Sequence, residues 1–194
     1  MNSLIAKYKS FETNHLIFDE IDVNDAELII KIRNSNKKSV LKPISESVQK
    51  QIEYISEYLI RNADNKEIYY KVKDKLSNMY VGLVRITELD CDYKFNWQSL
   101  IFTDLIKPYF VIDAIVALYY LGFEIFGKML CGPWEVPLHG GNVYKLHKKM
   151  NIATEIGKSQ ESYIFIVTRE EFINKVNFFN KLGFGIIRWE KLKF

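Results

Sequence analysis

A lysine stands at the expected start of the most apolar helix in the sequence, where it could bind a phosphate group. Lys107 and Pro108 separate a predicted strand, 95–103, from a predicted helix that closes at 126–127. Pro108 suits the first turn of a helix, where its missing N–H group costs nothing. The free N–H groups and the dipole at a helix start favour an anion, and Lys107 would add a positive charge. The pattern therefore predicts a phosphate seat, with a capped core helix that binds no ligand as the alternative.

A second segment combines titratable side chains with a glycine-rich turn. A predicted strand, 129–136, ends in Trp134-Glu135-Val136 and is followed by Gly140-Gly141-Asn142. Asn142 can cap the basic helix predicted over 143–149. Glutamate and histidine side chains in this region are able to act as general bases, and a histidine titrates near neutral pH. The alternative is a glycine turn, a capping asparagine and a solvated basic face, which need no ligand.

These two segments need a sheet and further helices to hold their side chains in place. The apolar spacing predicts one strand, two helices, three strands and then alternating helices and strands. Gly82, inside one strand, predicts a bulge or the close approach of another group. A meander joined to βαβ crossovers is typical of α/β or α+β proteins with a mixed sheet. The predicted strands are 15–21, 67–72, 79–87, 95–103, 129–136 and 162–168, and the predicted helices are 26–34, 48–59, 108–126, 143–149 and 169–180.

Length and composition favour one soluble domain of 194 residues, with 48% hydrophobic and 26% charged residues. The net charge of +3 is far below the basic excess of a dedicated nucleic-acid binder.

Cys91 and Cys131 form no disulfide framework and have no metal-ligand spacing, which favours a reducing cytoplasm. Residues 1–9 lack the features of a signal peptide. The apolar run 111–126 carries two acidic residues and is shorter than the roughly 20 residues of a membrane span, so we expect a buried helix.

The order of elements, with an asparagine opening the second helix, resembles the acyl-CoA-binding half of the GNAT N-acetyltransferases. The sequences Ile32-Arg33-Asn34 and Val81-Gly82-Leu83-Val84-Arg85-Ile86 resemble those of the sugar-nucleotide branch of the family. The segment from Trp134 to Lys149 resembles members that act on sugar nucleotides and on protein N-termini, including the ribosomal-protein N-acetyltransferases. The resemblance covers roughly 15–170. It implies an α/β (α+β) fold with a mixed, mostly antiparallel central sheet of six to seven strands flanked by helices. It also implies a single GNAT-like domain over 1–194, with an acyltransferase core at 15–170 and a C-terminal helix and tail at 171–194.

The resemblance implies acetyl-CoA as co-substrate, with no metal. The strand at 96–102 would hold pantetheine through backbone hydrogen bonds, and the loop at 107–110 would face the pyrophosphate. In the family this loop carries two glycines, which let the phosphates approach the backbone closely, and this sequence departs from the family there with Tyr109 and Val111 at those positions. The implied cofactor-binding residues are Ile101, Phe102, Thr103, Lys107, Tyr109, Phe110, Val111, Asn142 and His147.

Direct transfer of an acetyl group to an amine needs a neutral amine and a polarised thioester. The candidate bases are Glu135 and His139, with His147 further along, and Tyr144 could donate to the departing sulfur. Each of these residues has a structural or exposed role as its alternative. Arg33, Asn34 and Arg85 are the candidate acceptor-binding residues, because an arginine fork can hold a phosphate or a carboxylate. A surface salt bridge is the alternative for the arginines.

The resemblance therefore predicts a cytoplasmic N-acetyltransferase for a primary amine. The favoured acceptor is an amino sugar on a nucleotide carrier, as in surface-polysaccharide synthesis, and a protein N-terminus is the alternative within the enzyme class. A non-catalytic module that keeps the fold is the alternative outside it, favoured by the missing loop glycines. We expect no nucleic-acid or membrane partner. We also hypothesise that the aromatic tail, 178–194, packs on a second subunit as a homodimer.

Overall fold

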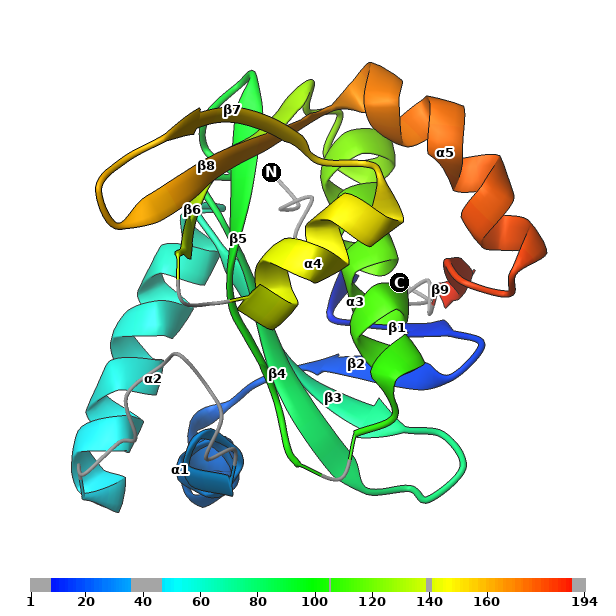
Figure 1. Cartoon of the computed structure of the whole chain (residues 1–194). Coiled ribbons are helices and arrows are strands. Elements are labelled where there is room, and N and C mark those ends of the chain that lie inside the picture. Colours follow the sequence, from blue (N-terminus) through cyan, green and yellow to red (C-terminus); the bar gives the residue numbers. More distant parts are fainter. Residues whose placement is uncertain (1–7, 36–46, 105, 139–140, 190–194) are drawn as a thin grey trace.

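A single mixed sheet forms the centre of the protein, and helices cover it (Figure 1). The computed structural model describes residues 8–35, 47–104, 106–138 and 141–189. Within them the sheet has nine strands in the order β7-β8-β6-β5-β4-β3-β2-β1-β9. All neighbouring strands are antiparallel except β5 and β6, which are parallel. The strands are β1 (Ser10–Thr13), β2 (Leu16–Glu20), β3 (Ile68–Asp74), β4 (Tyr80–Thr87), β5 (Lys94–Phe102), β6 (Leu130–Pro137), β7 (Thr154–Lys158), β8 (Ser162–Thr168) and β9 (Ile186–Trp189).

Five α-helices connect these strands. The first is preceded by a 3-10 turn, η2 (Val23–Asp25), and the third continues into a π-helical turn, η3 (Leu121–Ile125). The helices are α1 (Ala26–Ser35), α2 (Val48–Ala63), α3 (Pro108–Tyr120), α4 (Gly141–Met150) and α5 (Arg169–Lys181).

The fold class, the mixed and mostly antiparallel sheet, and the six predicted strands and five predicted helices are confirmed. The sheet is wider than the predicted six to seven strands, because β1, β7 and β9 were not anticipated. These three strands have only four or five residues each, and β7 (Thr-Glu-Ile-Gly-Lys) has no buried side chain that would produce an apolar alternation. β1 and β9 lie outside residues 15–170 and pair with each other at the end of the sheet.

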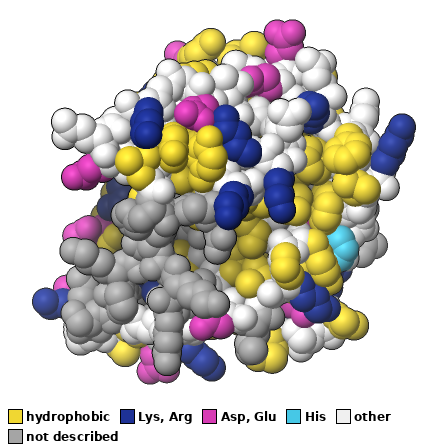
Figure 2. Space-filling view, viewed as in Figure 1, with side chains coloured by type: hydrophobic (Ala, Val, Ile, Leu, Met, Phe, Trp, Pro, Cys, Tyr) yellow, Lys and Arg dark blue, Asp and Glu magenta, His cyan; other side chains and the backbone are white. Residues whose placement is uncertain are grey.

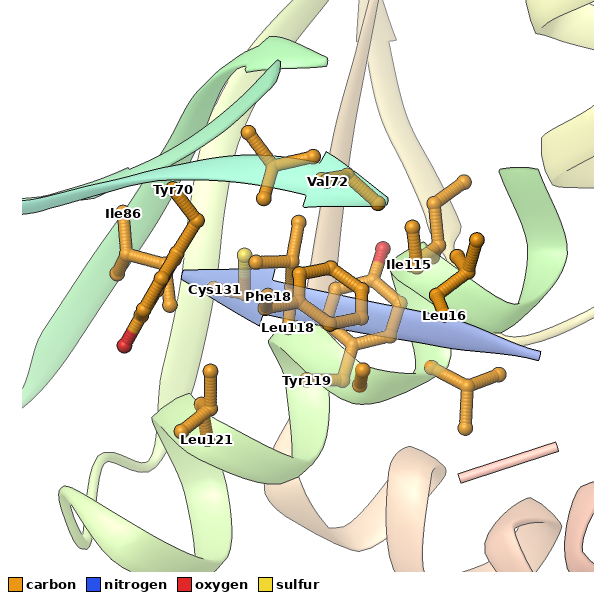
Figure 3. Close-up of a cluster of buried hydrophobic side chains, with 14 of the residues drawn as sticks. Leu16, Phe18, Tyr70, Val72, Ile86, Ile115, Leu118, Tyr119, Leu121 and Cys131 are labelled. Atoms are coloured by element: carbon orange, nitrogen blue, oxygen red, sulfur yellow. The ribbon is translucent and has the colours of Figure 1, made fainter. Parts of the chain in front are cut away.

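Alternating side chains of the sheet build two separate cores. Tyr69, Leu83 and Ile101 point to the face covered by α1 and α2, where they join the smaller core. Their neighbours in sequence, such as Tyr70 and Phe102, point to the larger core on the opposite face. Figure 3 shows this core, in which side chains of β2 and β3 meet the α3 side chains Ile115, Leu118 and Tyr119.

The buried helix predicted for the apolar run is confirmed. Pro108–Ile125 has the length and composition of a membrane span, but 61% of that window is buried inside the protein. From Asp113 to Tyr119 every residue of α3 is buried. Asp113 accepts hydrogen bonds from Thr13 (2.6 Å) and from the N–H of Gly185 (3.2 Å), and it lies 3.0 Å from His15. Burial raises the pKa of this carboxyl group. Asp113 thus ties the first hairpin and the chain before β9 to α3.

Two glycines allow aromatic rings to approach the backbone beside the β5–β6 region. A Cβ atom on Gly122 would lie 2.1 Å from the ring of Phe95, and one on Gly82 would lie 2.4 Å from the ring of Phe102. The close approach predicted at Gly82 is therefore confirmed. Any larger residue at either position would push an aromatic ring of the core out of place.

Candidate functional site

The parallel strands β5 and β6 separate after two residue pairs. They pair at Lys94–Leu130 and Phe95–Cys131, and beyond this point β6 pairs, within the described part of the chain, only with β8. A β-bulge follows in each strand, and the bulge in β5 contains Ser99 with a φ of 52°. Bulges bend a strand and increase its twist, so the two strands turn away from each other. A hydrogen bond from Asn96 Nδ2 to the Pro133 carbonyl oxygen (3.1 Å) bridges the strands near the point of separation.

The gap between the separated strands is an open cavity of about 630 Å³ that is also lined by α3 and α4. This volume is within the range of small-molecule and cofactor sites. Its walls are mainly apolar and aromatic, with a few polar groups. The lining residues are Asn96, Trp97, Gln98, Ser99, Leu100, Phe102, Ile106, Val111, Ile115, Trp134, Glu135, Val136, Pro137, Val143, Leu146 and His147.

His147 is a polar side chain in the apolar wall of this cavity. It is 2% exposed, and its ring centroid lies 5.3 Å from those of Trp134 and Phe165. Its Nε2 atom is buried and has no hydrogen-bond partner in the part of the chain that the structure describes. Burial lowers the pKa of His147 to about 4, so the imidazole is neutral at physiological pH.

Two tryptophans share this wall, and neither was identified from the sequence. The rings of Trp97 and Trp134 lie 5.4 Å apart, and the Nε1 atom of each is buried without a hydrogen-bond partner among the described residues. A buried indole N–H usually finds a partner, and leaving one unpaired costs about 1–3 kcal/mol. A ligand or a bound water in the cavity could complete the hydrogen bonds of such donors. Trp134 lies next to Glu135, but nothing in the sequence signals that its N–H is left unpaired.

Comparisons with known proteins give structural matches only; no family model matches the chain, and no curated protein does. FdhC, described as a nucleotide-linked sugar GNAT, has a TM-score of 0.76 at 22% identity, covering 87% of this chain and 96% of that one. A spermidine N-acetyltransferase from Vibrio cholerae, solved with CoA and spermine, has a TM-score of 0.64 at 18% identity, covering 82% and 98%. A putative ribosomal-protein-serine acetyltransferase from Vibrio cholerae has a TM-score of 0.67 at 14% identity, covering 82% and 97%. The chain has the GNAT fold.

Within this GNAT fold, three of the predicted cofactor-binding residues line the cavity. Phe102 comes from the end of β5, Val111 from the first turns of α3, and His147 from α4. Asn142 lies in the first turn of α4. Ile101 does not face the cavity, because the alternation along β5 turns it toward the α1/α2 core. Its backbone still lies on the strand that borders the cavity.

The remaining predicted cofactor residues surround the start of α3. Thr103, Lys107 and Phe110 line a second cavity of about 610 Å³ between α1, the β3–β4 turn and α3. Tyr109 packs against the ring of His15, with 4.9 Å between centroids. The Lys107 ammonium lies 5.8 Å and 5.6 Å from the ring centroids of Tyr109 and Phe110.

The start of α3 offers fewer free N–H groups than an ordinary helix. Pro108, at the first helical position, has none, and the N–H of Phe110 donates to the Lys107 carbonyl oxygen (2.9 Å). An ordinary helix start has four free N–H groups. A phosphate at this position would therefore depend more on side chains than the sequence pattern suggests.

The three predicted catalytic residues have different positions. Glu135 lines the cavity and is exposed on β6. His139 lies outside the described residues. Tyr144 is on a neighbouring face of α4, where its hydroxyl donates to Glu155 (3.1 Å) and its ring packs on Tyr163 at 4.3 Å. Burial and this hydrogen bond raise the pKa of the Tyr144 phenol.

The direction of Tyr144 follows from the apolar stripe of α4. Val143, Leu146 and His147 are spaced along one helical face and line the cavity, which leaves Tyr144 beside them. The basic residues predicted for this helix, Lys145, Lys148 and Lys149, are exposed. Figure 2 shows lysine and arginine side chains beside apolar ones on this face of the molecule.

The predicted acceptor residues lie on the α1/α2 side of the sheet. Arg85 donates to Glu67 through Nε (2.7 Å) and Nη2 and to the Tyr54 hydroxyl through Nη1 (2.8 Å), so it is part of an ion-pair network. The Nε atom of Arg33 is buried without a hydrogen-bond partner among the described residues. Asn34 is exposed.

One buried phenol connects these arginines to the cavity. The charges of Arg33 and Arg85 act on the hydroxyl of Tyr69, which also contacts the side chain of Ser99 at the β5 bulge. Ser99 lines the cavity. Burial is the main reason that the pKa of Tyr69 is raised.

Proposed function

We propose that the protein is an acetyl-CoA-dependent N-acetyltransferase that acts on a primary amine. The observation that carries this proposal is the cavity between the separated strands β5 and β6, with its apolar walls and its unpaired buried nitrogens. A protein of the same fold was solved with CoA, and several of the similar structures are acetyltransferases.

The edge of β5 that faces β6 suits an extended pantetheine arm. After Phe95 this edge has no strand partner among the residues that the structure describes, so its backbone groups could pair with the amides of a ligand. Pantetheine carries two amides and would add to the edge as a short extra strand. The apolar lining from α3 and α4 would cover its carbon atoms and exclude water from the thioester.

The reaction would be direct attack within a ternary complex. The amine nitrogen attacks the thioester carbon, the carbon–sulfur bond breaks, and the sulfur leaves with the electron pair. Glu135 is our candidate for the base that accepts the proton of the amine, because it is a carboxylate residue among those that line the cavity. Holding both reactants in one geometry would supply much of the rate. His139 stays a candidate base.

For the acceptor we propose an amino sugar on a nucleotide carrier. The unpaired Nε of Arg33 beside Tyr69 supports an anionic group on the acceptor, and FdhC is described as acting on nucleotide-linked sugars. Arg85 would help indirectly, since Glu67 and Tyr54 already bind its guanidinium group. A protein N-terminus is the second candidate acceptor.

A non-catalytic module remains the alternative outside the enzyme class. The start of α3 favours it, because Pro108 and Phe110 reduce the free N–H groups there.

Our proposal also includes a cytoplasmic location, small-molecule partners rather than nucleic acid or membrane, and a homodimer through the tail from residue 178. Phe178 and Leu182 are 58% and 53% exposed, which supports a contact surface.

Calorimetry with acetyl-CoA tests the cofactor proposal. Leu146→Trp should fill the cavity and weaken binding by more than about tenfold, whereas Lys145→Trp, on the exposed face of the same helix, should leave it unchanged. Thiol release with amino-sugar nucleotides, polyamines and peptide N-termini then tests the acceptor. Wild-type protein that binds no acyl-CoA would favour the non-catalytic alternative.

A further inference from the structure

Helix α4 carries two side chains able to contact a departing sulfur, and it points them in different directions. The Tyr144 hydroxyl is bonded to Glu155, which also pairs with Lys148 at 2.9 Å. His147, three residues later, lines the cavity together with Leu146. A reacting group in the cavity therefore meets the imidazole and not the phenol.

The surroundings of His147 keep its ring uncharged and in one orientation. The ring is packed against Trp97 (6.0 Å), Trp134 (5.3 Å) and Phe165 (5.3 Å), and its buried Nε2 contacts no carboxylate of the described residues within hydrogen-bond distance. A neutral imidazole carries one N–H donor and one lone pair. In the described structure its buried Nε2 is not bonded to a protein group, so the ring keeps hydrogen-bonding capacity for a ligand.

We propose that His147 is a catalytic residue that donates a hydrogen bond from its neutral imidazole to the thioester sulfur as it departs. This inference rests on the proposed acetyl-CoA-dependent function. When the amine nitrogen bonds to the carbonyl carbon, the carbon–sulfur bond breaks and negative charge develops on sulfur. His147 stabilises this charge and keeps its own proton. The proton of the amine passes to Glu135 or to solvent, so the thiolate leaves and all protons are accounted for.

A neutral donor fits this cavity better than a charged one. A protonated imidazole would have to be held in an apolar aromatic wall without a counter-ion, which is costly. A preorganised neutral donor needs no reorganisation when charge appears in the transition state. Because His147 stays neutral across the physiological range, its contribution to the rate should not titrate between about pH 6 and 9.

Calorimetry with CoA and desulfo-CoA tests the contact directly, since desulfo-CoA lacks only the sulfur. Wild-type protein should bind CoA about tenfold more tightly than desulfo-CoA, and His147→Phe should bind the two equally. His147→Asn, which restores a donor, should recover part of the difference. Tyr144→Phe, the control on the same helix, should keep the wild-type ratio.

Kinetics with acetyl-CoA add a second readout. His147→Phe should lower kcat about 10- to 100-fold while KM for acetyl-CoA changes less than about threefold, because the interaction strengthens in the transition state. If His147→Phe does not fold, His147→Asn gives the same comparison. An unchanged CoA to desulfo-CoA ratio and kcat in these variants would overturn the role of His147. Wild-type protein that binds neither ligand would instead overturn the proposed function.

Discussion

The two sides of strand β5 differ in how their buried polar groups are paired. On the α1/α2 side, the Tyr58 hydroxyl donates to Glu20 (3.0 Å) and accepts the N–H of Tyr69 (3.1 Å). The Glu67 carboxylate binds both Arg61 and Arg85. In the cavity on the other side, the buried Nε1 of Trp134 and Nε2 of His147 have no partner among the described residues, and the indole of Trp97 has only the buried Tyr119 hydroxyl nearby.

This difference separates polar groups that hold the fold from groups that are available to a ligand. A paired buried group contributes to stability, whereas an unpaired one costs about 1–3 kcal/mol. Each such group in a native protein needs an explanation, and a ligand that supplies the missing partner is one such explanation. Two groups on the α1/α2 side are also unpaired among the described residues, Thr87 Oγ1 and Arg33 Nε, and Arg33 is the arginine to which we assign the acceptor.

The largest predicted effect comes from removing the Glu67 carboxylate, which lies at the centre of the paired groups on the α1/α2 side. Glu67→Ala should lower the free energy of unfolding by about 3 to 4 kcal/mol, because it leaves two guanidinium groups without their carboxylate. Urea denaturation at neutral pH measures this loss, and Glu67→Gln, which keeps an acceptor oxygen, should lose less. The folded Glu67→Ala protein should bind acetyl-CoA as the wild type does. Weaker cofactor binding with unchanged stability would show that the paired side also serves the ligand.

The unpaired side should make stability depend on pH. The pKa of His147 is lowered from 6.5 to about 4 by burial, so below pH 6.5 the unfolded chain binds a proton that the folded protein does not. The free energy of unfolding should therefore fall by at most about 3 kcal/mol as the pH drops from 6.5 to 4, and this contribution should be constant above 6.5.

His147→Phe provides the control for this prediction. The variant should lack the part of the pH dependence that comes from the imidazole, and at pH 7 it should be as stable as the wild type or more so, because an unpaired nitrogen is replaced by carbon. Denaturation curves of both proteins from pH 4 to 7 give the comparison. Parallel curves for the two proteins would mean that the imidazole has a partner that keeps its pKa normal.

Most of the fold could be predicted from the sequence, because strands and helices with one apolar face have a clear spacing. β7 could not, since its five residues carry no apolar alternation. The cavity could not be predicted either, because it depends on two bulges. The bulge in β5 contains Ser99 with a positive φ, and a serine in a sequence gives no sign of that backbone conformation. The face of α4 was a different case. From the sequence we assign both Tyr144 and His147 to the site, although the helical spacing of Val143, Leu146 and His147 would have been enough to direct His147 rather than Tyr144 toward the cavity.

Gly122 tests whether the closed end of the cavity must keep its shape. A Cβ atom in Gly122→Ala would overlap the ring of Phe95, which belongs to the last residue pair between β5 and β6. Overpacking of this kind should cost about 2 kcal/mol and should also weaken acetyl-CoA binding, because the ring moves where the strands separate. Thermal denaturation and calorimetry measure the two effects. Gly157→Ala, where the nearest atom is 3.8 Å away, should change neither.

The smallest expected effect concerns the residue of α4 that is paired. Tyr144→Phe removes a hydrogen bond to Glu155 that is partly open to solvent, and Lys148 still binds that carboxylate. The loss of stability should therefore stay below about 1 kcal/mol. Neither kcat nor the affinity for acetyl-CoA should change, because the phenol points toward β7 and β8. A drop in kcat comparable to that of His147→Phe would mean that Tyr144 turns into the cavity when the cofactor binds, and the distinction between paired and unpaired groups would then fail on this helix.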